Sequence, residues 1–281
     1  MSNPLITNRY LHQIPVVDLM TTLQSVQINP TELCNRTCSF CPRSNSTVYK
    51  NAKQFISKET CKHIGEQLNE FEFKGRVGFV GFGEPLLHKK LPECISIIKK
   101  ACPTIQWIEV NTNGDFLTKE LIEALYNAGC TDLTISMYDS DMSEYFESMC
   151  KGISINLTLR HYYDIKNINF IDRLAVIQQK PVNIKRPCYI PFYKLFIDWN
   201  GDFLLCDQDW GRRTNQFNIS STTIKDFWSA KINDYRKNLI NGNREKNTPC
   251  NSCDVNGTII GQASFDYISH HLGCIDNSAK N

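Results

Sequence analysis

Three cysteines stand within eight residues of this chain, in the stretch Cys34-Asn35-Arg36-Thr37-Cys38-Ser39-Phe40-Cys41. Three thiolates on one short loop can each bind one iron of a single iron–sulfur cluster, and a cubane held by three cysteines keeps its fourth iron open to another ligand. The alternative is a structural zinc site, which needs four ligands. The first histidine downstream is His63, too far along the chain to complete such a set. The stretch therefore predicts an iron–sulfur cluster with one open iron.

Strand and helix patterns alternate regularly around this loop. Such repeats favour right-handed β-α-β units and a parallel sheet, with the chemistry at the carboxyl ends of the strands. The cysteine loop follows the first of the expected strands. We expect strands at residues 25–29, 76–80, 107–111, 132–136 and 155–160, a weaker sixth at 168–175, and helices at 59–71, 92–101, 118–128 and 141–151.

A glycine-rich turn, Gly81-Phe82-Gly83-Glu84-Pro85, follows the second expected strand. Glycines allow the backbone to approach a ligand closely, and Glu84 supplies an acceptor at the strand end. A turn of this composition can also be only a turn. Because it comes one β-α unit after the cysteine loop, we interpret it as part of the same binding site.

The C-x3-C-x2-C spacing, the aromatic Phe40 and the Gly83-Glu84-Pro85 turn resemble the motifs of the radical S-adenosylmethionine (SAM) superfamily. Phe82 between the glycines departs from the usual G-G-E-P pattern. The resemblance implies a SAM-binding [4Fe-4S] cluster on Cys34, Cys38 and Cys41, and reductive cleavage of SAM to a 5'-deoxyadenosyl radical.

The resemblance also implies which side chains contact SAM. In the family, an aromatic residue packs beside adenine, the glycine turn and its acid hold the ammonium group, and polar groups at later strand ends bind ribose and carboxylate. A guanidinium grips a carboxylate in bidentate fashion. Asn113 and Ser136 could equally be polar caps of their strands. By position, the contacts would come from Phe40, Gly83, Glu84, Asn113, Ser136 and Arg160.

A second group of cysteines lies near the C-terminus. Residues 193–199 and 202–206 read as a β-hairpin, since Asn200-Gly201 suits a type I′ turn, and a helix is expected over 224–239. The cysteines are Cys188, Cys206, Cys250 and Cys253. They could hold a second cluster or a four-thiolate zinc ion. Their spacing resembles the twitch and SPASM appendages of radical SAM enzymes. It implies the shorter twitch version with one auxiliary [4Fe-4S] cluster, because no further cysteines follow until Cys274.

The expected fold class is therefore α/β, a partial (β/α)6 radical SAM barrel with a small C-terminal β-hairpin plus helix twitch/SPASM-like domain. We expect an N-terminal extension over 1–24, the barrel over 25–184 and the auxiliary cluster domain over 185–281.

Composition limits the partners. The net charge is +2 with scattered Lys and Arg, which gives no footprint for nucleic acid. There is no signal peptide and no apolar run long enough to span a membrane, so we expect a cytoplasmic protein. Thirteen cysteines form no even disulfide framework, and in a reducing compartment they indicate metal ligation.

In architecture the chain resembles the aminocyclitol dehydrogenase of butirosin biosynthesis and related epimerases. The resemblance implies hydrogen abstraction from a carbinol carbon of a hydroxylated carbohydrate or cyclitol, giving oxidation or epimerisation. It also implies a small-molecule, carbohydrate-like substrate and a flavodoxin- or ferredoxin-type electron donor. One alternative is a radical SAM peptide-modifying maturase, although only about 24 residues precede the first strand. A further alternative is a non-catalytic iron–sulfur or zinc scaffold, which would leave Gly83-Glu84-Pro85 without a role.

Overall fold

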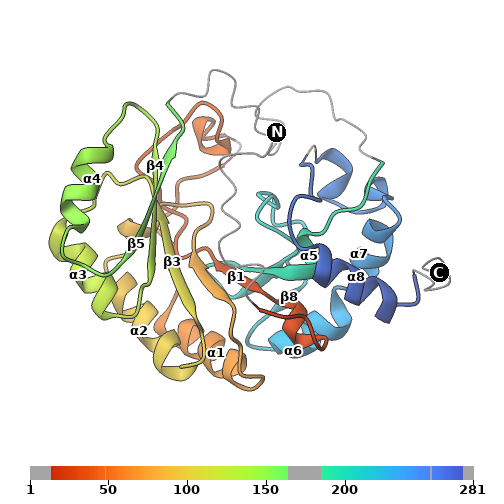
Figure 1. Ribbon diagram of the computed structural model, residues 1–281. Coiled ribbons are helices and arrows are strands. Elements are labelled where there is room, and N and C mark those ends of the chain that lie inside the picture. The colour runs from red at the N-terminus through yellow and green to blue at the C-terminus, as the bar shows by residue number, and fades with distance from the viewer. Residues whose placement is uncertain (1–13, 48, 164–184, 254, 275–281) are drawn as a thin grey trace.

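Eight strands form one open sheet in the computed structural model, which describes residues 14–47, 49–163, 185–253 and 255–274 (Figure 1). The strand order is β5-β4-β3-β2-β1-β6-β7-β8. The first five strands are parallel to their neighbours, which confirms the expected sheet: β1 (Ser25–Ile28), β2 (Arg76–Phe79), β3 (Trp107–Thr112), β4 (Asp132–Met137) and β5 (Asn156–His161). The sixth candidate strand, 168–175, lies outside the described residues.

Four helices follow these strands as crossovers and lie along the outside of the sheet in Figure 1: α1 (Lys58–Asn69), α2 (Leu91–Ala101), α3 (Lys119–Asn127) and α4 (Ser143–Cys150). Side-chain caps set where two of them begin. The Ser57 hydroxyl accepts from the Thr60 amide to cap α1, and Thr118 accepts from the Leu121 amide to cap α3.

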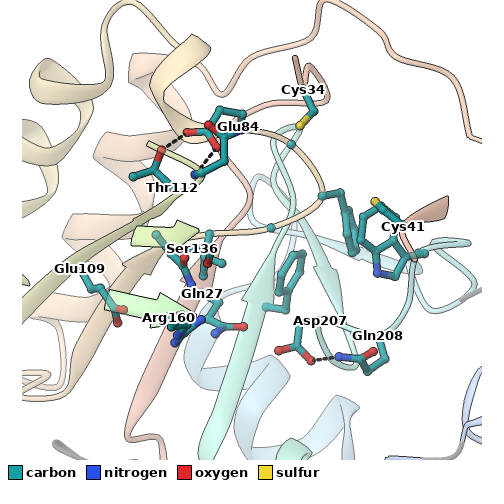
Figure 2. Close-up of a pocket in the computed structure, with 18 of the residues that line it drawn as sticks. Gln27, Cys34, Cys41, Glu84, Glu109, Thr112, Ser136, Arg160, Asp207 and Gln208 are labelled. Atoms are coloured by element: carbon teal, nitrogen blue, oxygen red, sulfur yellow. Dashed lines mark hydrogen bonds between the residues drawn. The ribbon is translucent and has the colours of Figure 1, made fainter. Parts of the chain in front are cut away.

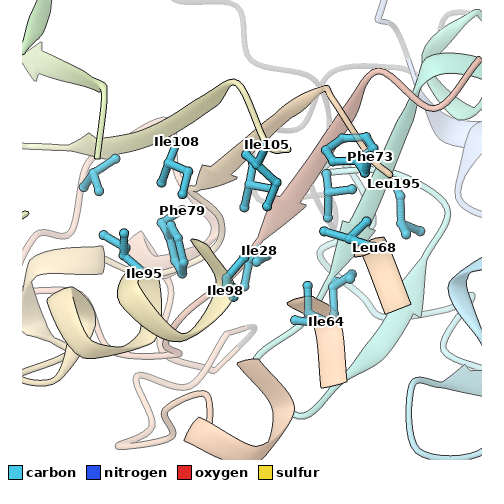
Figure 3. Packing of buried hydrophobic residues seen from close by; sticks show 14 of the residues in the cluster. Ile28, Ile64, Leu68, Phe73, Phe79, Ile95, Ile98, Ile105, Ile108 and Leu195 are labelled. Carbon is cyan, nitrogen blue, oxygen red and sulfur yellow. The ribbon is translucent and has the colours of Figure 1, made fainter. Parts of the chain in front are cut away.

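The two faces of the sheet differ because successive residues of a strand point to opposite sides. Ile28, Phe79 and Ile108 point outward with Leu195, and they pack on α1 and α2 through Ile64, Leu68, Ile95 and Ile98 (Figure 3). Polar residues of β1 to β5 alternate with the apolar ones and line the cavity on the inner face: Gln27, Arg76, Glu109, Ser136 and Arg160. The apolar half of each strand therefore forms the core, and the polar half is left for a ligand.

The expected hairpin is present, and it extends the same sheet. β6 (Lys194–Ile197) pairs in parallel with β1, and β7 (Asp202–Leu204) and β8 (Phe217–Asn218) continue from it antiparallel. Gly201 adopts a positive φ of 88° in the connecting turn, a conformation that suits glycine. The parallel pairing of β6 with β1 was not predicted, because nothing local in a hairpin shows which outer strand its edge meets.

The prediction of one continuous helix over 224–239 is wrong. The segment is divided into α6 (Ile224–Asp226), a π-helical turn (Phe227–Lys231) and α7 (Asn233–Ile240). The carbonyl of Trp228 accepts from Arg236 Nη1 at 2.5 Å, and the Ile232 amide bonds instead to the Phe227 carbonyl at 3.2 Å. Because the buried Arg236 side chain occupies the Trp228 carbonyl, that carbonyl does not accept the usual α-helical hydrogen bond, and the turn widens to a π-helical one.

The remaining described elements are short or terminal. They comprise α5 (Ile190–Tyr193), α8 (Gln262–His271) and 3₁₀ turns at Met20–Thr22, Pro42–Ser44, Pro85–Leu87, Arg244–Lys246 and Cys250–Ser252. Within the described part of the chain, no helix combines the length and apolarity needed to cross a membrane.

Candidate functional site

A cavity of about 490 Å³ lies on the polar face of the sheet, at the carboxyl ends of the parallel strands (Figure 2). The three cysteines of the first loop line it, and so does every residue expected to contact SAM. Its lining thus contains Cys34, Cys38, Cys41, Phe40, Gly83, Glu84, Asn113, Ser136 and Arg160. The structure brings into one space residues that come from the ends of five strands.

Two side chains hold the cysteine loop in place. The Asn51 carboxamide bonds to both backbone groups of Cys34, accepting from its amide and donating to its carbonyl, each at 2.9 Å. Arg43 donates to Asn51 Oδ1 at 2.9 Å and to the Phe82 carbonyl at 2.5 Å. The loop is therefore tied directly to the glycine turn that follows β2.

The donor chemistry of this loop fits an iron–sulfur cluster. In the described residues no three His, Cys, Asp or Glu side chains converge on a point where one metal ion could bind. A cluster instead takes its thiolates on separate irons, so three cysteines spread along one wall of a cavity suit it.

A second set of contacts joins the cysteine loop to the turn after β3. Arg36 forms a bidentate pair with Asp115, with both distances 2.6 Å, and the Asn35 side chain donates to the same carboxylate. Asn113 donates to Asn35 Oδ1 at 2.9 Å. The side chain expected near ribose therefore already binds the cysteine loop, and it lines the cavity from that position.

Glu84 is buried and its carboxylate bridges two strand ends. One oxygen accepts from Thr112 Oγ1 at 2.5 Å and from the Leu86 amide at 3.1 Å, and the other accepts from the Asn113 amide at 2.9 Å. Burial raises the pKa of Glu84 to about 7, and the three hydrogen bonds offset only part of that rise. The acid expected to hold an ammonium group is thus preorganised by β2 and β3.

This raised pKa predicts a pH dependence of stability. A carboxyl group that binds its proton more tightly when folded stabilises the fold as the pH falls through 7 toward the unfolded value near 4.5. We expect the thermal unfolding midpoint to be higher at pH 5.5 than at pH 8, and Glu84→Gln to reduce this difference. Differential scanning calorimetry at both pH values measures it. An unfolding midpoint that rises with pH in the wild type would contradict the assignment.

Gly83 is required for a reason that the sequence did not show. A Cβ atom at this position would lie 2.1 Å from the Thr31 carbonyl oxygen and 2.7 Å from that of Leu33. The Glu84 amide, next along the chain, donates to the Leu33 carbonyl at 2.8 Å. The glycine therefore lets the turn after β2 press against the segment that leads into the cysteine loop, in addition to any contact with a ligand.

Three aromatic rings cluster at the cavity wall. Phe40 lies 5.6 Å from the ring of Tyr138, and Tyr138 stacks on Tyr162 at 5.1 Å with an interplanar angle of 25°. Ser136 hydrogen-bonds to Tyr138. Tyr162 was missed in the sequence, although it follows Arg160 by two residues and stands directly after β5. The three rings offer a flat apolar surface of the kind that adenine stacks on.

The opposite part of the cavity contains two ion pairs. Glu109 pairs with Arg76 and accepts from Thr134 at 2.5 Å. Lys194, on β6 of the hairpin, pairs with Asp207, which follows the hairpin, and its Nζ lies 2.7 Å from the carboxylate. Burial alone would raise the pKa of Glu109, but Arg76 holds it below the usual value.

Polar groups without partners lie in the same part of the cavity. Among the described residues, buried Arg160 Nε, Gln27 Oε1 and Gln208 Oε1 have no hydrogen-bond partner. Such groups are costly when buried unless a ligand or water satisfies them. Of the residues after the hairpin, Asp207 and Trp210 line the cavity, whereas Asp209 binds the Arg213 and Thr214 amides in a turn.

The four C-terminal cysteines also gather in space. Burial raises the pKa of Cys206 well above its usual value, and Asp207, Cys250 and Cys253 raise it further. Cys188 and Cys253 act on Cys250 in the same direction. The four thiols therefore lie close enough to affect one another's ionisation.

Arg244 connects the segment that leads to Cys188 with the one that follows Cys253. It is buried and donates to four backbone carbonyls, two before Cys188 and two after Cys253, at 2.6 to 3.1 Å: those of Arg186, Pro187, Val255 and Asn256. This role could not be predicted from the sequence, because a single arginine in a polar segment is ordinary.

Two family models match the chain. The model of the radical SAM superfamily matches residues 28–177, and that of the SPASM iron–sulfur cluster-binding domain matches residues 188–254. Each match contains one of the two cysteine groups. The regions therefore carry a SAM-binding [4Fe-4S] cluster and an auxiliary cluster, and SAM is a cofactor.

Individual relatives agree with the family models. The chain is 26% identical over 255 residues to the S-adenosyl-L-methionine-dependent 2-deoxy-scyllo-inosamine dehydrogenase of Niallia circulans, covering 90% of this chain and 100% of that protein. It is 35% identical over 155 residues to the GTP 3',8-cyclase of Aquifex aeolicus, of which the match spans only 47%. The crystal structure of BtrN in complex with AdoMet and 2-DOIA superposes with a TM-score of 0.71 at 25% identity, covering 83% of this chain and 94% of that one.

Proposed function

Because the chain belongs to the radical SAM superfamily, we propose that it oxidises a secondary alcohol of a cyclitol or a similar hydroxylated carbohydrate to the ketone. When bound, SAM and its cluster supply the 5'-deoxyadenosyl radical that takes a hydrogen atom from the carbinol carbon. In becoming a ketone, the substrate then also releases one proton and one electron. The full-length similarity to a cyclitol dehydrogenase supports this reaction.

The chain's own residues would orient the reactants. Cys34, Cys38 and Cys41 would hold the SAM-binding cluster, Glu84 the ammonium group and Arg160 the carboxylate. Phe40, with Tyr138 and Tyr162, would pack beside adenine, and Asn113 and Ser136 would lie near ribose. The polar residues on the far side of the cavity, including Gln27 and Lys194, remain for the substrate.

One observation favours oxidation over epimerisation. Asp207 and Gln208 line the cavity, and they directly follow Cys206, one of the four cysteines proposed to hold the auxiliary cluster. The residues that would contact the substrate are therefore adjacent in sequence to a ligand of the auxiliary cluster, which can accept the substrate's electron. An electron donor of the flavodoxin or ferredoxin type would supply the electron for SAM cleavage.

The test uses the anaerobically reconstituted protein with scyllo-inositol deuterated at its carbinol carbons. We expect deuterium in 5'-deoxyadenosine and one ketone formed for each SAM consumed. A product with an inverted carbinol carbon and hydrogen taken from solvent would identify epimerisation instead. SAM cleavage that only a peptide stimulates would favour the maturase, and no 5'-deoxyadenosine at all would favour the scaffold.

A further inference from the structure

We infer that the part of the cavity lined by Gln27 and Gln208 selects a neutral polyhydroxylated substrate over one that carries an ammonium group. This inference rests on the proposed function and deepens it by naming the substrate class. The evidence is the state of the polar groups in that part of the cavity.

Among the described residues, every carboxylate that lines the cavity is already engaged by other groups of this chain. Glu84 accepts three hydrogen bonds, Glu109 pairs with Arg76, and Asp207 pairs with Lys194 at 2.7 Å. An ammonium ion buried in such a space needs a carboxylate to offset its desolvation. A substrate ammonium group would have to compete with Arg76 for Glu109 or with Lys194 for Asp207.

The acceptors that remain among the described lining residues are uncharged. Gln27 lies on β1 and Gln208 follows the hairpin, and the Oε1 atom of each is buried without a partner among the described residues. Gln208 Nε2 donates to Asp207 at 3.1 Å, which fixes the orientation of this carboxamide and leaves its oxygen as the free end (Figure 2). Carboxamide oxygens accept well from hydroxyl groups and carry no charge to attract a cation.

The positive charges of the region act in the same direction. Arg76, Arg160 and Lys194 line this part of the cavity against two carboxylates, Glu109 and Asp207. If Arg160 binds the SAM carboxylate, the charges that remain in this part of the cavity are the Arg76–Glu109 and Lys194–Asp207 pairs. Their net charge is zero. A cyclitol whose hydroxyl groups donate to Gln27 and Gln208 satisfies the partnerless oxygens without disturbing either ion pair.

The experiment compares scyllo-inositol with scyllo-inosamine, in which one hydroxyl is replaced by an amine that is protonated at pH 7. Calorimetric titration of the reconstituted, SAM-loaded protein gives affinity, and ketone formation gives kcat/KM. We expect the wild type to favour scyllo-inositol by about tenfold or more in both. Gln27→Glu should shift the preference toward the amine by a similar factor, and Gln27→Leu should weaken scyllo-inositol binding. The exposed Gln216→Glu is the matched control and should keep the wild-type preference.

The outcomes separate this inference from the proposed function. A wild type that prefers scyllo-inosamine overturns the inference while oxidation of a cyclitol stands. A preference for scyllo-inositol that Gln27→Glu leaves unchanged overturns the role of Gln27. If SAM is cleaved but neither cyclitol is bound or oxidised, the proposed function fails and the inference fails with it. Because the wild-type comparison needs no variant, it remains decisive even if a substitution impairs folding.

Discussion

Replacement of Cys34, Cys38 and Cys41 by alanine is expected to abolish 5'-deoxyadenosine formation and to lower the iron content from about eight to about four atoms per chain. The three thiols line the cavity as one set, so no other residue of the loop can substitute for them. The four C-terminal cysteines lie outside this loop, and Arg244 joins the segments next to Cys188 and Cys253, so they should keep their own cluster. Iron and sulfide analysis after anaerobic reconstitution, with chromatography of the SAM products, measures both effects.

The control for this variant is Cys150→Ala, a largely buried cysteine at the end of α4 and outside the residues that line the cavity. It should retain wild-type iron and SAM cleavage. If the triple variant holds no iron, the C-terminal cysteines bind zinc or are structural, and a redox-neutral reaction such as epimerisation becomes the better explanation. If it still cleaves SAM, the assignment of the first cluster is wrong.

Arg212→Met is expected to lower the free energy of unfolding by about 3–5 kcal/mol, because it leaves two buried carboxylates without their shared cation. Arg212 pairs with Asp198 and with Glu32, and it donates to the Tyr49 hydroxyl at 2.9 Å. The side chain of Asp198 is 0% exposed and that of Glu32 8%, so water cannot replace the guanidinium. For a chain of this size, the unfolding midpoint should fall by roughly 10 °C.

The neighbouring Arg213 provides a matched control, since it is exposed and Arg213→Met removes the same charge from the surface. That variant should unfold within about 0.5 kcal/mol of the wild type. Loss of the guanidinium makes the two carboxylates easier to protonate, so Arg212→Met should regain part of its stability as the pH is lowered. Equal effects of the two substitutions would show that Arg212 acts only through net charge.

The Arg212 contacts also explain why the site is continuous across distant parts of the chain. Asn29, at the end of β1, donates to Asp198 at 2.7 Å, and its Oδ1 accepts from the Phe82 amide at 3.0 Å. The hairpin, the first strand end and the glycine turn are thus joined by one set of buried polar contacts. Asn29, Asp198 and Arg212 did not stand out in the sequence, because each is an ordinary polar residue until its partner is known.

The sequence by itself determined the parallel strands β1–β5, the hairpin and the two cysteine groups. Alternation of apolar residues, turn residues such as Asn200-Gly201 and the spacing of ligands are local properties, and a local pattern can be read along one chain. The six expected SAM contacts all line the cavity because each comes from the carboxyl end of an expected strand or from the loop after it. Their roles toward SAM remain predictions.

Only the tertiary structure decided which of these local pieces meet. The pairing of β6 with β1, the bond from Arg236 that splits the helix after residue 226, and the approach of Lys194 to Asp207 all join groups that the sequence leaves independent. The same holds for Gln27 and Gln208, which come from β1 and the segment after β7 and lie in one cavity. A buried polar group is satisfied by whichever partner the packed chain brings to it, and that choice depends on the whole fold rather than on neighbours in sequence.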